Sequence, residues 1–168
     1  MIVIGLDPGY EQSAIVVWDG DRIVQHFYDE NDRIADRFRA RNIRDGSVLV
    51  IEGIESMGMA VGKTTFETVY WTGRFAEAYL PNMVERIPRR LIKLHLCGQS
   101  RATDSNIRQA LIDRFGPSTE KAIGKKASPG PLYGITAHKL SALAVALTYY
   151  DQMNDRPQEI RPGVVPEF

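Results

Sequence analysis

Three apolar strands precede the first helix that the sequence predicts, and this order constrains the fold more than any other feature. The strands span residues 1–7, 13–19 and 22–29. Asp19-Gly20-Asp21, between the second and the third, is a short hairpin signal, so we expect the three strands to be antiparallel. Residues 2–6 are β-branched or apolar apart from Gly5, as in a strand that is buried on both faces.

Helices and strands alternate along the rest of the chain, over ranges that apolar spacing and turn residues define. We expect helices over residues 31–44, 65–80, 88–96, 103–115 and 135–151, and strands over residues 47–52 and 83–87. A strand that follows a helix joins its sheet in parallel in most cases. The sequence therefore predicts an α/β fold with a five-stranded mixed sheet and helices on both faces.

Two of the predicted helices carry apolar stripes that we expect to face the sheet. The stripe of the helix at 65–80 consists of Phe66, Val69, Tyr70, Gly73 and Ala76, and that of the last helix of Ala142, Leu143, Ala146, Leu147 and Tyr150. Gly73 would permit close packing against the sheet. Residues 116–134, rich in Gly, Pro, Ser and Lys, have the composition of a mobile loop.

Length and composition predict one domain in a reducing compartment. We assign residues 1–153 to that domain and residues 154–168, with three prolines, to a flexible tail. The single Cys97 cannot form an internal disulfide. No apolar run approaches the about 18 residues of a membrane span, and the N-terminus lacks the basic start of a signal peptide. We expect a cytoplasmic protein without a membrane partner.

The charge of the chain is unevenly distributed although its net charge is zero. Residues 86–126 hold ten Lys or Arg and three Asp or Glu, a net charge of +7, which leaves −7 on the remainder. A cationic surface on an acidic body suits a polyanionic partner such as a nucleic acid. The alternative is that these residues only solvate helices.

Two carboxylates end apolar strands in the same way. Asp7 closes the first strand, before a Pro8-Gly9 turn, and Glu52 closes the strand at 47–52. Asp before Pro-Gly is also a good turn former, so Asp7 alone would indicate little. If the two strands are neighbours, the carboxylates lie a few Å apart at one sheet edge, where they repel each other. A divalent cation between them makes the arrangement favourable, and Mg²⁺ prefers such oxygen ligands.

Three segments together resemble the RuvC-type Holliday junction resolvases of the ribonuclease H-like superfamily. They are Ile4-Gly-Leu-Asp-Pro-Gly9, Val50-Ile-Glu52 and Ala142-Leu-Ala-Val-Ala-Leu-Thr148. The segments at 53–62, 66–75 and 97–105 are similar in kind to those of phage-borne members. The resemblance covers roughly residues 1–150 and implies a ribonuclease H-like fold.

The resemblance also implies a set of site residues. Asp7 and Glu52 match the first two metal-binding carboxylates of the family, and His138 and Ser141 stand where its last helix carries two acids. His138 can bind a metal or carry a proton. Ser141 departs from the pattern, because a hydroxyl is a poor metal ligand; the site then holds one metal, or His138 and Glu55 help to complete it. The implied cofactor is Mg²⁺, for which Mn²⁺ can substitute. The alternatives are that His138 is a solvated residue at a helix start and that Glu55 is a surface charge.

The partners that the resemblance implies are branched DNA, four-way junctions above all, and a second copy of the chain. Met57, Met59 and Phe66 lie where the family places apolar residues at the junction or the dimer interface; core packing is the alternative for Phe66. For contacts with DNA phosphates we select loop residues beside the last helix and a basic helix: Arg101, Lys125, Lys126, Arg89, Arg90 and Lys93.

The function that follows is a metal-dependent, structure-selective DNA endonuclease of a bacterial or phage-infected cell, with Asp7, Glu52 and His138 as catalytic residues. One alternative is a junction-binding protein that has lost catalysis through Ser141. A second is an actin-like sugar kinase or ATPase, which needs two such domains and about twice this length. No nucleotide cofactor is expected, because the glycines of Gly58-Met-Ala-Val-Gly62 are separated by three residues instead of the four of a P-loop.

Overall fold

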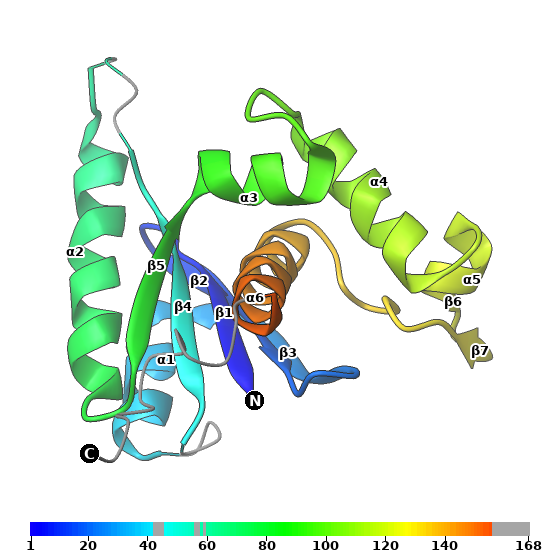
Figure 1. The fold of residues 1–168 in the computed structure, drawn as a ribbon. Coiled ribbons are helices and arrows are strands. Elements are labelled where there is room, and N and C mark those ends of the chain that lie inside the picture. Colours follow the sequence, from blue (N-terminus) through cyan, green and yellow to red (C-terminus); the bar gives the residue numbers. More distant parts are fainter. Residues whose placement is uncertain (42–45, 56–57, 59, 156–168) are drawn as a thin grey trace, which may run out of the picture.

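Five strands form one mixed sheet in a computed structural model of the chain, which describes residues 1–41, 46–55, 58 and 60–155 (Figure 1). The strands are β1 (Val3–Asp7), β2 (Gln12–Trp18), β3 (Ile23–Glu30), β4 (Val48–Gly53) and β5 (Val84–Pro88), in the spatial order β3-β2-β1-β4-β5. The strands β1, β2 and β3 pair antiparallel, whereas β4 pairs parallel with both β1 and β5. The predicted five-stranded mixed sheet is confirmed.

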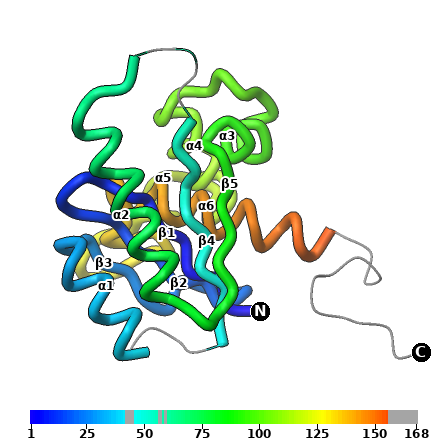
Figure 2. The backbone as a smooth tube through the Cα atoms, turned by 90° about the vertical axis from the view of Figure 1, so that its left-hand side faces the viewer, coloured from blue at the N-terminus to red at the C-terminus, as the bar shows by residue number. Residues whose placement is uncertain are grey.

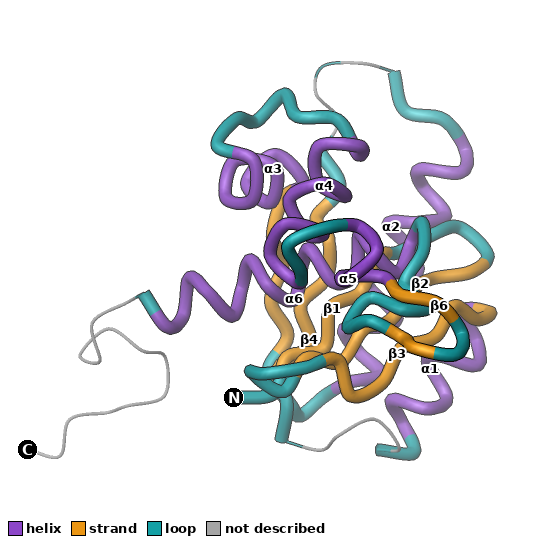
Figure 3. Tube along the Cα trace, turned by 90° about the vertical axis from the view of Figure 1, so that its right-hand side faces the viewer, coloured by secondary structure: helices purple, strands orange, loops and turns teal. Residues whose placement is uncertain are grey.

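Helices cover both faces of this sheet, as predicted. The helices are α1 (Asn31–Arg39), α2 (Lys63–Tyr79), α3 (Arg89–Cys97), α4 (Asp104–Phe115), α5 (Thr119–Ile123) and α6 (His138–Asn154). Helices α1 and α2 lie over one face (Figure 2), and α6, with α3, α4 and α5 beside it, lies on the other (Figure 3). Alternation along β1 separates two cores: Ile4 and Leu6 pack with the α1–α2 side, and Val3 with the α6 side.

Helix α6 packs directly on β1 because the residue between them is a glycine. A Cβ atom placed on Gly5 would lie 2.0 Å from the carbonyl oxygen of Ala142 and 2.9 Å from the Cβ of Ala146. The predicted stripe of α6 is confirmed, with Leu143 and Leu147 fully buried. This contact fixes the start of α6 at the edge of the sheet where β1 ends.

The turn after β1 is held by a buried polar network. Ser13 Oγ accepts a hydrogen bond from the Gly9 amide (3.1 Å) and donates one to Asn31 Oδ1 (2.7 Å). The Nδ2 group of Asn31 donates in turn to the carbonyl of Gly9 (2.9 Å). These bonds satisfy the buried polar groups of the turn and anchor it to the start of α1.

An ionic cluster at the far end of α6 ties three helices together. Arg114 on α4 donates to both oxygens of Asp151 (2.6 and 2.8 Å), and His95 on α3 lies 2.8 Å from Asp151 Oδ2. Burial raises the pKa of Asp151, but the hydrogen bonds of Arg114 and His95 outweigh it and hold that pKa below its usual value.

The predicted stripe of α2 faces away from the sheet except at Ala76, which packs against the core, so the prediction is wrong for its other members. Phe66, Val69 and Tyr70 are 50 to 63% exposed, and a Cβ on Gly73 would meet no atom within 4 Å. The inner face instead carries Thr72, Phe75, Ala78 and Tyr79. Thr72 tolerates burial because its hydroxyl donates to the carbonyl of Thr68 (2.9 Å), a local bond that apolar spacing does not reveal.

Three boundaries also differ from the prediction. The segment at 116–134 is not a plain loop, since it contains α5 and the short hairpin of β6 (Gly124–Lys125) and β7 (Ser128–Pro129). The last helix begins at His138, and α1 ends at Arg39.

Some predictions concern residues outside the described part of the chain. These residues are Met57, Met59, residues 42–45 and residues 156–168, which make up most of the predicted tail. None of the helices in the described part of the chain has the length and apolarity of a membrane span.

Substitution of Gly5 by alanine tests the contact between β1 and α6. The added methyl group meets the helix backbone, so we expect the free energy of unfolding to fall by about 3 kcal/mol in urea titrations. Gly62→Ala is the control, because a Cβ there meets no atom within 4 Å and φ is −88°. Equal stability of the two variants would contradict the close packing.

Candidate active site

Adjacent parallel strands bring Asp7 and Glu52 to one edge of the sheet. In the register of β1 and β4, Leu6 lies opposite Ile51, so the next residue on each strand is a carboxylate. Both side chains are only 13% exposed. The strands are therefore neighbours, as the carboxylate hypothesis requires, and the two acids occupy a largely desolvated edge.

Burial makes this pair of carboxylates electrostatically costly. It raises the pKa of Asp7, and the hydrogen bond and charge of His138 counter the rise only in part. Burial likewise raises the pKa of Glu52; Arg89 opposes that rise, and the charge of Asp7 adds to it. The site therefore holds less positive charge than two ionised carboxylates need.

His138 joins the site from the first residue of α6. Its Nδ1 donates to Asp7 Oδ2 over 2.8 Å, which leaves Nε2 as the ring nitrogen that can exchange a proton with a ligand. The imidazole also stacks on Tyr28 of β3, with ring centroids 5.2 Å apart and planes 6° from parallel. Two contacts thus orient a side chain that remains 62% exposed.

Arg89 is the principal counter-charge of Glu52. Its Nη1 donates to both Glu52 oxygens (2.7 and 2.8 Å), and its Nη2 donates to Asp104 Oδ1 (2.5 Å). Burial lowers the pKa of the Arg89 guanidinium, and the two carboxylates more than reverse this effect. The sequence predicts Arg89 to be a DNA contact, whereas the structure places it inside the acidic site, at the start of α3.

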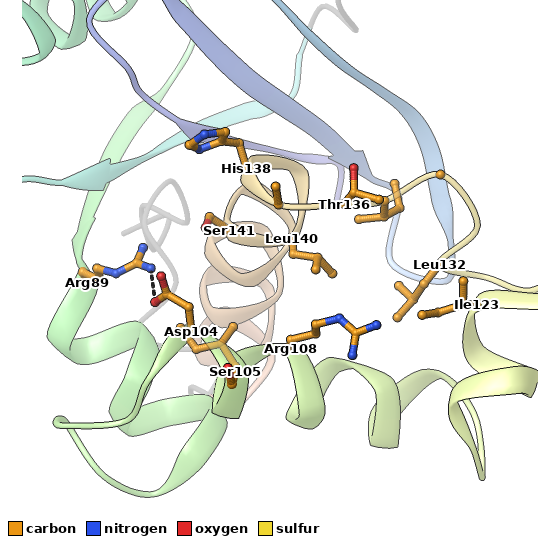
Figure 4. Close-up of a pocket in the computed structure, with 14 residues that line it drawn as sticks. Arg89, Asp104, Ser105, Arg108, Ile123, Leu132, Thr136, His138, Leu140 and Ser141 are labelled. Atoms are coloured by element: carbon orange, nitrogen blue, oxygen red, sulfur yellow. Dashed lines mark hydrogen bonds and ion pairs between the residues drawn. The ribbon is translucent and has the colours of Figure 1, made fainter.

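A cavity of about 430 Å³ opens beside these residues (Figure 4). Arg89, Asp104, His138 and Ser141 line it, together with apolar side chains of α4 and α6 and of the segment between α5 and α6. Ser141 therefore lies on the wall of the site, one helical turn after His138. Glu55 is not among the residues that line this cavity; it lines a second one, of about 260 Å³, with Glu52 and Arg89, and its carboxylate pairs there with Arg90 at 3.2 Å.

The donor set fits a hard divalent cation. Among the described residues no three His, Cys, Asp or Glu side chains already converge as a metal cluster. Asp7 and Glu52 nevertheless supply buried, adjacent carboxylates, and burial raises the pKa of both. Oxygen ligands of this kind suit Mg²⁺, and added positive charge would favour their ionised forms.

Of the other basic residues predicted to contact DNA, Arg90 and Lys93 line the second cavity together with Glu52, whereas Arg101, Lys125 and Lys126 line neither cavity. Arg101 and Lys126 are exposed in turns, and Lys125 is exposed at the end of β6, 3.8 Å from Glu120. Arg90 and Lys93 lie on α3, beside the loop that follows β4. These positions suit contacts with an extended anion rather than with a metal.

Three residues near the site escaped sequence reasoning, namely Tyr28, Asp104 and Arg108. Asp104 has the signature of a helix start, which hides any second role. Tyr28 and Arg108 carry no local signal, because only the tertiary fold brings β3 and α4 to the start of α6.

Comparisons with solved structures assign the fold. Thermus thermophilus RuvC superposes with a TM-score of 0.64 over 92% of this chain and 97% of that one, at 19% sequence identity. T. thermophilus RuvC in complex with a Holliday junction substrate gives 0.60 over 91% and 96%, at 18% identity. The fold is RuvC-like. The predicted ribonuclease H-like fold class is thereby confirmed. No protein-family model and no curated protein sequence matches the chain.

Substitution of Asp7 by asparagine tests the electrostatic cost of burying the two carboxylates. The pKa of Asp7 is raised in the folded state, so the ionised carboxylate destabilises the wild type above that pKa. At low pH the carboxyl group is protonated in the folded and in the unfolded state, and this cost disappears. We expect Asp7→Asn to raise the free energy of unfolding by about 1 kcal/mol at pH 7, with the gain vanishing below about pH 4. A gain that does not change between pH 4 and pH 8, or no gain, would contradict this account.

Proposed function

We propose that this protein is a divalent-metal-dependent endodeoxyribonuclease that cuts four-way junctions and other branched DNA. The observation that carries the proposal is the pair of buried carboxylates, Asp7 and Glu52, at the ends of neighbouring parallel strands, with His138 hydrogen-bonded to one of them. The RuvC-like fold supports the choice of substrate, since one of the similar structures is a complex with a Holliday junction substrate. The sequence segments cited above favour a phage-borne member acting in the cytoplasm of a bacterial or infected cell.

Asp7, Glu52 and His138 carry the proposed hydrolysis of the phosphodiester bond. Asp7 and Glu52 would hold Mg²⁺ or Mn²⁺, which when bound supplies positive charge to the scissile phosphate and lowers the pKa of the attacking water. The water oxygen bonds to phosphorus as the bond to the 3′ oxygen breaks, which leaves a 5′-phosphate and a 3′-hydroxyl. His138, oriented by Asp7 and Tyr28, carries a proton through Nε2.

The basic surface beside the site supports binding of DNA phosphates. Several Lys and Arg residues between positions 86 and 126 have no carboxylate within 4.0 Å among the described residues: Arg86, Lys93, Arg101, Arg108, Lys121 and Lys126. Arg108 lines the cavity that opens next to His138 (Figure 4). Such unpaired cations release counterions when they meet a phosphate backbone, so affinity would fall steeply with salt.

The outward face of α2 supports a homodimer. Phe66, Val69, Tyr70 and Gly73 follow helical spacing, and the first three are at least half exposed. The open space above Gly73 would let a second helix approach closely. We propose that two copies pair through this face, so that two sites act on the two strands of a junction.

Cleavage assays test the proposed activity. With Mn²⁺ or Mg²⁺, the wild type should nick labelled four-way junctions in preference to linear duplex, and Asp7→Asn should abolish nicking while junction binding persists, because the variant keeps the basic surface. Asp113→Asn, an exposed change on α4, is the control and should cut normally. Undiminished cleavage by Asp7→Asn would contradict the assignment.

The same assay addresses the second candidate, a junction-binding protein without nuclease activity. Two observations favour it: a serine lines the cavity at position 141, and Arg89 engages both oxygens of Glu52. Junction binding without nicking in any divalent metal would establish this function and remove the enzymatic one.

Light scattering and sedimentation test the dimer. Phe66→Lys places a charge on the exposed apolar face, and we expect it to weaken dimerisation by about 30-fold, which corresponds to about 2 kcal/mol. Leu94→Lys, at a position that is 49% exposed on α3, should leave the dimer intact. A wild-type chain that stays monomeric at high concentration would contradict the proposal.

A further inference from the structure

Asp104 stands at the start of α4 without serving as its cap. Thr103 occupies the N-cap position, where its hydroxyl accepts from the Asn106 amide (3.3 Å) and the Asn106 side chain accepts from the Thr103 amide (2.8 Å). This capping box satisfies the first turn of the helix without Asp104. The Asp104 carboxylate is directed instead to Arg89, at the wall of the cavity (Figure 4).

Among the described residues, no acid lines the opposite wall of the same cavity. Helix α6 contributes His138 and, one turn later, Ser141, whose hydroxyl is a weak ligand for a hard cation. Figure 4 shows Ser141 and Asp104 on facing elements, α6 and α4, with Arg89 beside them. A carboxylate therefore reaches this part of the site from a helix other than α6.

Asp104 shares its cationic partner with a buried carboxylate. The Arg89 guanidinium donates through Nη1 to both oxygens of Glu52 and through Nη2 to Asp104 Oδ1, so these two carboxylates lie against the same side chain. Among the described residues, the ion-pair partners of Asp7, Glu52 and Asp104 are one guanidinium, that of Arg89, and one exposed imidazole, that of His138.

We propose that Asp104 is the third carboxylate of the cation site, supplying from α4 the anionic oxygen that Ser141 does not supply from α6. The inference rests on the proposed function. Arg89 then has a role as well. Its guanidinium must release the oxygens of Glu52 and Asp104 before these oxygens can bind a cation. Arg89 released in this way is free to pair with a DNA phosphate, the contact expected from the sequence.

Binding of Mn²⁺ to the full chain, measured by calorimetry and by electron paramagnetic resonance, tests this role without relying on cleavage. We expect Asp104→Asn to weaken Mn²⁺ binding by about 10- to 100-fold. Asp113→Asn is the matched control: Asp113 lies on the same helix, is exposed, and accepts from Gln109 (2.7 Å) away from the site. It should bind Mn²⁺ like the wild type.

Two further variants separate a ligand from a residue that only positions Arg89. In an Arg89→Met background, Asp104→Asn should still weaken Mn²⁺ binding if Asp104 is a ligand. It should have no further effect if Asp104 acts only through Arg89, and that result would overturn the proposal. Adding Ser141→Asp to the Asp104→Asn variant should restore binding, because it returns a carboxylate to the opposite wall of the cavity.

Asp7→Asn distinguishes failure of this inference from failure of the proposed function. If Asp7→Asn loses Mn²⁺ binding and Asp104→Asn keeps it, Asp104 is not a ligand and the proposed nuclease stands. If the wild type binds no Mn²⁺, alone or with junction DNA, the metal-dependent function itself is overturned.

Discussion

The close approach of α6 to β1 at Gly5 determines the geometry of the site. A strand and a helix can pack at this distance only where one of them carries no side chain, and Gly5 and the small residues Ala142 and Ala146 meet this condition. The contact lies two residues before Asp7 on the strand and four after His138 on the helix. Packing in the core therefore sets the distance between a carboxylate and an imidazole at the sheet edge.

Electrostatics at that edge oppose folding and support function. The carboxylates of Asp7 and Glu52 are buried together, and their partners His138 and Arg89 offset only part of the cost. Groups arranged in this way are typical of sites where a ligand supplies the missing charge. The protein thus gives up some stability to keep two acids adjacent, as the proposed cation site requires.

The sequence predicts those parts of the structure that local patterns encode. Apolar strands ending in acids pointed to Asp7 and Glu52 as a pair on the condition that their strands are neighbours, which the structure meets, and the small apolar stripe of α6 predicted its burial. The predictions are wrong where tertiary contacts determine which residues are buried. The stripe of α2 faces outward because Thr72 and Phe75, not Phe66 and Tyr70, meet the sheet. Asp104 was overlooked because its position predicts a helix start, and only the fold brings that helix to the carboxylates.

The buried network around the turn after β1 has a consequence for how this protein can vary. Ser13 must accept from Gly9 and donate to Asn31, while Asn31 must accept and donate through one amide. Few residue pairs satisfy these roles in the same volume. The placement of Asp7 therefore depends on two uncharged side chains from β2 and α1, which leaves those positions as little freedom to change as the acids themselves.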